Sequence, residues 1–175
     1  LDAILVNASG CGTMLKDYGY MLKDELNWAN RAKNISDLTC DISEFLFEID
    51  LKVDGKFNPP KIAYHSACSL QHGQKIHDKP LALLKSAGFE VRVPKESHLC
   101  CGSAGTYSLL QPNLAEQLRS RKVKHLEATE ARLIATGNIG CIAFISQGLN
   151  SKSSMSIVHT TELLDWATGG PQPRY

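Results

Sequence analysis

Leu99-Cys100-Cys101-Gly102-Ser103-Ala104-Gly105 is the stretch that says most about the fold of this 175-residue chain. Neighbouring residues on an extended backbone point in opposite directions, so two adjacent cysteines fill a hydrophobic core badly. They suit a turn that directs sulfur towards a common centre. Gly102 and Gly105 let the backbone approach a bulky ligand and aim N–H groups at sulfur. The stretch therefore predicts a tight loop at a cysteine-based binding site.

Three further cysteines lie in small-residue loops elsewhere in the chain. Cys68 precedes Cys100 with 31 residues between them, and Cys141 follows Cys101 with 39 residues between them. Cys11 lies in the segment Asn7-Ala8-Ser9-Gly10-Cys11-Gly12. These spacings are far too long for one local motif, so only the tertiary fold can bring the sulfurs together.

The composition is that of a globular domain with one hydrophobic core. The chain is 43% hydrophobic and has a formal net charge of +1, which gives no indication of a nucleic-acid partner. A basic run at 119–124 follows a helical pattern and is interpreted as a solvated helix face. No apolar stretch approaches the roughly 20 residues that span a bilayer. Because the chain opens at Leu1 inside an apolar run, we expect it to be a piece of a longer protein.

The six cysteines are not expected to form disulfides. The chain shows no secretory signal segment, and disulfides are typical of secreted proteins. Metal or cluster ligation, redox chemistry and inert buried thiols remain as alternatives. Cys40, which follows no strand-plus-glycine loop, is interpreted as a small buried hydrophobic residue, since free cysteine is often simply buried.

Short apolar strands alternate with helical segments, which predicts an α/β fold with a parallel sheet flanked by helices. Strands are expected at 3–6, 61–64, 89–93, 132–135 and 156–158. Helices are expected at 14–29, 42–49, 73–87, 112–128 and 160–167. Asp54-Gly55 and Pro59-Pro60 predict a connecting loop.

The cysteine loops each follow a predicted strand. In an open parallel sheet, ligands bind beyond the carboxyl ends of the strands, so these loops should converge at one edge. We therefore predict a metal site whose candidate ligands are Cys11, Cys68, Cys100, Cys101 and Cys141. The candidate backbone contacts to a bound group are Gly102, Gly105 and Gly140.

A weak internal repeat divides the chain. The loop 8–12 is similar to 137–141, and the segment 41–46 is similar to 159–164. We expect residues 1–57 to be the end of a truncated first repeat and residues 58–175 to be a whole second repeat.

The cysteine pattern resembles the cysteine-rich CCG domain, which occurs, usually twice, in heterodisulfide reductases and in related iron–sulfur subunits. The chain most resembles the iron–sulfur subunits of bacterial glycolate oxidases. The segments that carry the likeness are His65-Ser66-Ala67-Cys68-Ser69-Leu70-Gln71-His72-Gly73-Gln74, Glu96–Tyr107, Gly137–Cys141 and Asn7–Gly12. Phe144 and Met14 stand where the wider pattern has a second cysteine of a Cys-x-x-Cys pair.

The resemblance implies an electron-transfer subunit that holds a [4Fe–4S]-type cluster. Its partner would be a flavin-containing subunit that oxidises glycolate, with electrons passing to quinone. The resemblance also implies a cytoplasmic protein that is peripheral to the inner face of the bacterial plasma membrane. A cysteine zinc site or a metal-free docking domain in the same complex is the alternative, as is the corresponding subunit of a lactate or glycerol-3-phosphate oxidising system.

Three histidines near the cysteine loops could take part in the predicted metal site. His65, His72 and His98 flank these loops and are candidates to complete a metal site or to hydrogen-bond a bound cluster. Their alternative role is that of polar loop residues at the edge of the sheet. No phosphate loop or nucleophile elbow is present, so the sequence gives no support to hydrolytic chemistry.

Overall fold

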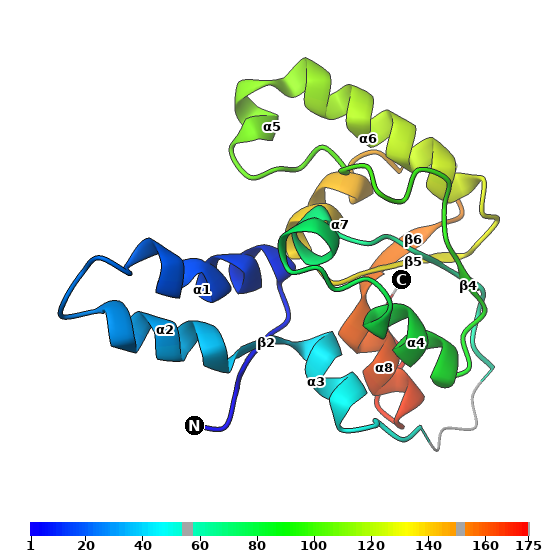
Figure 1. Ribbon diagram of the computed structural model, residues 1–175. Coiled ribbons are helices and arrows are strands. Elements are labelled where there is room, and N and C mark those ends of the chain that lie inside the picture. Colours follow the sequence, from blue (N-terminus) through cyan, green and yellow to red (C-terminus); the bar gives the residue numbers. More distant parts are fainter. Residues whose placement is uncertain (54–57, 150–152, 175) are drawn as a thin grey trace.

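The computed structural model describes residues 1–53, 58–149 and 153–174 (Figure 1). Its main sheet has four strands in the order β4 (Val91–Arg92), β3 (Ile62–Tyr64), β5 (Leu133–Thr136) and β6 (Ser156–His159). Every neighbouring pair in this sheet is parallel. The predicted parallel α/β fold is thus confirmed. The turn expected at Asp54-Gly55 lies outside the described residues.

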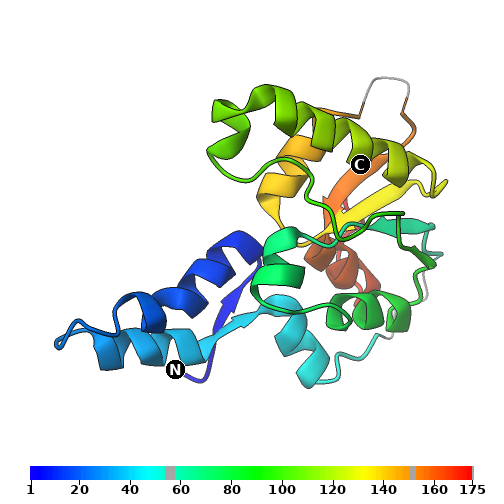
Figure 2. The ribbon, with the colours of Figure 1, turned by 45° about the horizontal axis from the view of Figure 1, so that its top comes forward.

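Helices cover both faces of this sheet (Figures 1 and 2). On one face, the core joins Ile62 and Tyr64 of β3 to side chains of α4 (Lys79–Ser86) and α8 (Thr160–Ala167). On the other face, Ala63 faces side chains of α6 (Pro112–Glu127) and α7 (Ile139–Ser146). The alternation follows from the two-residue period of a strand. Each large apolar side chain that is fully buried here contributes about 1.5–3 kcal/mol.

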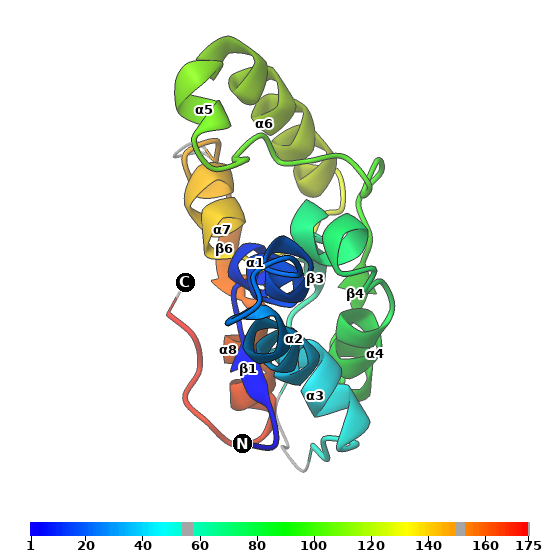
Figure 3. The same cartoon turned by 60° about the vertical axis from the view of Figure 1, so that its left-hand side comes forward.

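A second, two-stranded sheet is formed by the N-terminal part of the chain. Strands β1 (Ile4–Val6) and β2 (Thr39–Asp41) pair in parallel. They are connected through α1 (Ser9–Met21) and α2 (Ala29–Leu38), which pack side by side as an arm beside the main sheet (Figures 1 and 3). Helix α3 (Ile42–Glu48) follows β2 directly.

The two ends of the chain share an order of elements. In each, a strand leads through helix to a parallel strand, and a short helix follows at once: β2 runs into α3 as β6 runs into α8. Both short helices begin with a capping box, Asp41 with Glu44 and His159 with Glu162. The sequence similarity of 41–46 to 159–164 thus extends to local structure, while the division into two repeats at 57 and 58 stays a prediction.

Several predicted boundaries are wrong. The helix expected at 14–29 begins at Ser9 and ends at Met21, and α2 and β2 were not predicted. The helix expected at 73–87 is instead the short π-helical turn η1 (Ser69–Gly73), a connecting segment, and α4. Pro80, in the first turn of α4, marks the true start, since proline is favoured there. A four-residue helix, α5 (Tyr107–Leu110), precedes α6.

Two residue-level interpretations are also corrected. Cys40 is half-buried on β2, and its thiol donates to the backbone oxygen of Asp41 over 3.4 Å. The basic run on α6 is not a uniformly solvated face, because Lys122 is 2% exposed. Its ammonium donates to the backbone oxygen of Glu96 over 2.9 Å, which satisfies the buried charge in part.

Candidate metal centre

A cavity of about 320 Å³ lies beyond the carboxyl ends of the strands and is lined by cysteines. All five predicted metal-binding cysteines contribute to its wall, together with Gly105 and Gly140. The wall consists of Ala8, Gly10, Cys11, Cys68, Ser69, Cys100, Cys101, Ser103, Ala104, Gly105, Asn138, Ile139, Gly140 and Cys141. The predicted convergence of sequence-distant loops at one sheet edge is therefore what the structure shows.

Three adjacent strands position four of these thiols. Cys68 immediately precedes η1 in the segment after β3, and the Cys100-Cys101 pair lies in the connection between β4 and α5. Cys141 lies in the first turn of α7, after β5. Because β4, β3 and β5 are neighbours in the sheet, their three following segments meet at one place.

Cys11 reaches the cavity from the other sheet. It lies in the first turn of α1, which follows β1, and it is exposed. The structure therefore places Cys11 at the same cavity as the other four cysteines, although from the N-terminal arm. Cys11 and Cys141 both occupy helix first turns, where the sequence had predicted loops.

The thiols approach one another in two pairs. Cys68 Sγ lies 3.8 Å from Cys100 Sγ, and Cys101 Sγ lies 3.4 Å from Cys141 Sγ. A disulfide would need about 2.05 Å, so all of these cysteines are free thiols. Free thiols at contact distance, drawn from three segments, form a compact set of soft ligands.

The protons within this set are unevenly shared. Hydrogen bonds with Cys101 and Cys68 hold the pKa of Cys100 well below that of a free thiol. The hydrogen bond with Cys101 likewise lowers the pKa of Cys141. The pKa values of Cys68 and Cys101 are raised, chiefly because each donates to a neighbouring sulfur and because both are partly desolvated. Metal ligation requires thiolates, so these groups would release protons on binding.

The turn after the two cysteines depends on Gly102. Its φ is +95°, and a Cβ atom there would lie 2.4 Å from the backbone oxygen of Ala115. The Gly102 N–H donates to Cys100 Sγ over 3.3 Å, as the sequence predicted for a glycine of this loop. Gly105 also has a positive φ, of 57°, but open space surrounds its missing Cβ. The N–H of Gly140 donates to the side chain of Asn138 over 2.8 Å.

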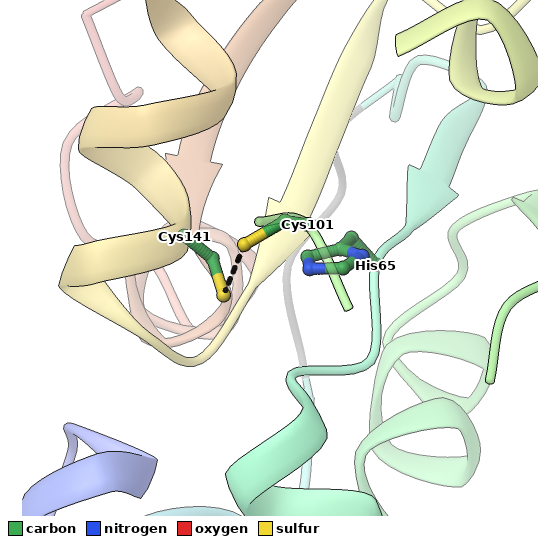
Figure 4. Close-up of side chains that lie close together, drawn as sticks. All are labelled: His65, Cys101 and Cys141. Atoms are coloured by element: carbon green, nitrogen blue, oxygen red, sulfur yellow. Dashed lines mark hydrogen bonds between the residues drawn. The ribbon is translucent and has the colours of Figure 1, made fainter. Parts of the chain in front are cut away.

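Histidine 65 lies beside the inner pair of thiols (Figure 4). Its imidazole and the sulfurs of Cys101 and Cys141 place their ligand atoms within 4.8 Å of one another, and all three residues are buried. None of the three histidines lines the cavity wall itself, but His72 and His98 are directed elsewhere, since His72 Nε2 contacts the backbone oxygen of His98 at 2.9 Å. Of the three histidines considered from sequence, the structure brings only His65 to the thiols.

A polar junction beneath the cavity joins the arm to the main sheet. Ser9 Oγ and Ser69 Oγ are 2.7 Å apart, and the Asn138 amide donates to both of these hydroxyls. Thr13 Oγ1 donates to the backbone oxygens of Ser9 and Ser69, and the Gln74 amide also donates to the Ser9 oxygen. This junction fixes α1, η1 and α7 relative to one another. The sequence showed Ser9, Ser69 and Asn138 only as members of small-residue loops and gave no sign of this junction.

The donor set fits a soft metal or an iron–sulfur cluster. Iron–sulfur clusters are held by cysteine thiolates and are tuned by N–H···S bonds and burial, both of which this site provides. The thiols are free, they lie at contact distance, and Gly102 already directs an N–H at one of them. None of the helices in the part of the chain that the structure describes is long and apolar enough to cross a membrane.

Comparison with known proteins agrees with the geometry. Residues 62–146 match the family model of the cysteine-rich domain CCG. The chain is 40% identical over 166 residues to the glycolate oxidase iron-sulfur subunit of Escherichia coli K12, covering 95% of the chain and 40% of that protein. It is 33% identical over 175 residues to a probable glycolate oxidase iron-sulfur subunit of Bacillus subtilis, covering 97% and 39%.

A further relative is covered more completely. Lactate utilization protein A of Anoxybacillus flavithermus is 30% identical over 168 residues, which is 94% of the chain and 70% of that protein. The chain spans about two fifths of the length of the two glycolate oxidase subunits that it matches. The resemblance seen in the cysteine spacing is confirmed, and the chain belongs to the cysteine-rich CCG family that includes the glycolate oxidase iron-sulfur subunits and lactate utilization protein A.

Proposed function

We propose that this chain binds an iron–sulfur cluster and acts as an electron-transfer part of an enzyme complex that oxidises a small 2-hydroxy acid. The observation that carries the proposal is the convergence of four free thiols from three segments at one edge of a parallel sheet, with sulfur pairs 3.4 and 3.8 Å apart. Cys68, Cys100, Cys101 and Cys141 are the proposed ligands. When bound, a cluster of the [4Fe–4S] type supplies reversible one-electron transfer.

The role of the protein residues is to hold and tune that group. The Gly102 N–H, already bonded to Cys100 Sγ, stabilises thiolate charge and thereby raises the reduction potential. Cys11, which faces the same cavity from α1, is a proposed fifth ligand. Cys11 is exposed, unlike Cys101 and Cys141, which are buried.

Support for the proposed partner and substrate comes from the relatives' names. Proteins named as iron-sulfur subunits of glycolate oxidase belong to complexes of more than one subunit. We propose a flavin-containing partner in which oxidation of the hydroxy acid releases two protons and two electrons. This chain would carry the electrons, one at a time, towards a quinone at the inner face of the plasma membrane. Glycolate is the substrate that the more similar relatives favour, with lactate as the alternative.

Metal analysis under anaerobic conditions tests the cluster. The chain would be reconstituted with iron and sulfide, and its iron, zinc and acid-labile sulfide content measured with its visible spectrum before and after dithionite. Iron with sulfide and a bleachable absorbance are expected. Cys101→Ser should remove most of the iron, whereas Cys40→Ser, whose thiol lies outside the cavity, should retain it. Zinc without sulfide, or full iron in Cys101→Ser, would contradict the proposal.

A further inference from the structure

Among the described residues, His65 is the buried polar side chain that the fold leaves most conspicuously unsatisfied. It is 1% exposed, and within the described part of the chain neither Nδ1 nor Nε2 has a hydrogen bond of good geometry. The polar group that the ring faces is the Cys141 thiol, whose pKa the ring helps to lower. Buried polar groups are almost always paired, because an unpaired one loses its hydrogen bonds to water without replacement. The ring therefore carries two free nitrogen sites in a place where a ligand would satisfy one of them.

The backbone holds this ring in a fixed position. The His65 N–H donates to the backbone oxygen of Ala135 over 2.9 Å, which continues the β3–β5 ladder by one residue. His65 thus occupies the carboxyl end of the central strand, between the segments that supply the cysteines. This backbone bond fixes where the His65 Cα lies, and the tight burial of the side chain restricts the ring to the neighbourhood of the inner thiols.

The ring lies next to the two most buried thiols. Its ligand nitrogen and the sulfurs of Cys101 and Cys141 lie within 4.8 Å of one another, and Figure 4 shows the ring beside both sulfurs. Cys101 and Cys141 are 1% and 4% exposed. A neutral imidazole beside two thiolates is a donor set that both iron and zinc accept.

We propose that His65 is a nitrogen ligand of the metal centre, adjacent to Cys101 and Cys141, so that this centre has a mixed sulfur and nitrogen donor set. The inference rests on the proposed function. It explains why the fold tolerates two unpaired ring nitrogens in its core. Imidazole is neutral where thiolate is anionic, so its ligation makes the site less negative and raises the reduction potential relative to an all-cysteine site.

Pulsed electron paramagnetic resonance on the full chain tests the ligand directly. The chain would be labelled with ¹⁵N-histidine, reconstituted with iron and sulfide, and measured in its paramagnetic redox state. A strong hyperfine coupling to histidine ¹⁵N is expected. The coupling should disappear in His65→Ala and persist in His72→Ala, because His65 lies with Cys101 and Cys141 whereas His72 Nε2 contacts the backbone oxygen of His98.

Rescue by a second ligand type provides an independent readout. His65→Cys should retain iron and sulfide close to the wild-type amounts and lower the reduction potential, since it exchanges a neutral ligand for an anionic one. His65→Ala should lose at least half of the iron.

Three results would overturn the inference. If the wild-type chain holds its cluster but shows no coupling, or only the weak coupling of a hydrogen-bonded ring, His65 is not a ligand. The same follows if the coupling persists in His65→Ala. If the wild-type chain holds no iron and sulfide at all, the proposed function fails, and this inference fails with it.

Discussion

At the scale of single residues, the turn that follows Cys100 and Cys101 requires a glycine at position 102. Gly102 has no Cβ. A Cβ atom built at this position would lie only 2.4 Å from the backbone oxygen of Ala115. The same position would bring a Cβ within 3.0 Å of the Phe144 ring. The close approach of α6 and α7 to the turn is thus possible only with glycine.

Gly102→Ala is expected to be strongly destabilising. The substitution places alanine in a left-handed backbone conformation, and the added Cβ would clash with a backbone oxygen of α6, which cannot move aside. A loss of about 3 kcal/mol or more in the free energy of unfolding is expected. Iron content after reconstitution should fall as well. Urea denaturation monitored by circular dichroism is the measurement.

Gly105→Ala is the matched control. This residue also has a positive φ, but nothing lies within 4 Å of the added Cβ, so only about 1 kcal/mol is expected. Equal losses for the two variants would show that backbone conformation alone, and not packing against α6 and α7, determines the need for glycine.

The identity of the candidate ligands could be predicted from the sequence, whereas their surroundings could not. The cysteines follow apolar strands, and the carboxyl ends of parallel strands meet at one edge of a sheet. These two facts were sufficient to predict that Cys68 and Cys141 lie near each other. The contribution of His65 depends on burial and on the absence of a hydrogen-bond partner among the described residues. Both are properties of neighbours distant in sequence, so the pattern around Cys68 showed the histidine but not its orientation.

At the scale of elements, α3 shows how one carboxylate connects three helices. Glu44 accepts from the Asp41 N–H at the start of α3, and its carboxylate also contacts Lys16 of α1 at 2.6 Å and Lys79 of α4 at 3.6 Å. Partial burial raises the pKa of Glu44, but the hydrogen bond and charge of Lys16 outweigh this, so its pKa lies below the ordinary value.

The sign of this shift fixes the pH dependence of Glu44→Gln. Because the pKa of Glu44 is lower in the folded state, its ionised carboxylate stabilises the fold. This contribution is complete above the unfolded-state pKa of about 4.3 and is lost as the pH falls through the folded-state pKa. Glu44→Gln should therefore lower the free energy of unfolding by about 1 kcal/mol at pH 7. The difference from wild type should vanish in more acidic buffer, as measured by urea denaturation at several pH values.

Glu48→Gln separates this effect from a general change in charge. Glu48 is exposed and pairs with Lys79, so the change should cost less than about 0.5 kcal/mol at any pH. Asp41, whose pKa is raised chiefly by burial and also by the charge of Glu44, titrates alike in wild type and in Glu48→Gln, whereas Glu44→Gln removes that charge and lowers the Asp41 pKa. A Glu44→Gln deficit that does not depend on pH would refute the ionic explanation.

Elements with a strong local signal were predicted well, and those held by tertiary contacts were not. Helix α8 and strand β3 have the expected positions, because caps and apolar runs mark their ends. Strand β2 is three residues long and exists through its pairing with β1, where Cys40 lies opposite Leu5. No local pattern in Thr39–Asp41 announces that pairing.

At the scale of the whole molecule, Asn138 joins parts that are far apart in sequence. Its side-chain oxygen caps α7 by accepting from the Gly140 N–H. Its amide nitrogen donates to the hydroxyl of Ser9 in α1 and to the hydroxyl of Ser69 in η1. One side chain thus contributes both to a helix terminus and to the contact between the two sheets.

Two substitutions at this position separate its roles. Asn138→Asp keeps the capping oxygen and loses the two donated hydrogen bonds, while Asn138→Ala loses both functions. We expect losses of about 1 and 2 kcal/mol, respectively. Hydrogen exchange should accelerate in α1 in both variants and in α7 only in Asn138→Ala. Unchanged exchange in α1 would show that other contacts hold the arm.

The wide spacing of the thiols along the chain has a consequence for biogenesis. From Cys68 to Cys141, the cysteines belong to segments that meet only after β4, β3 and β5 have paired. A chain still emerging from the ribosome can offer one or two thiols but never the full set. A metal centre held by all four thiols would therefore form only after the sheet has folded, so whatever supplies the metal would meet a folded surface rather than a linear motif.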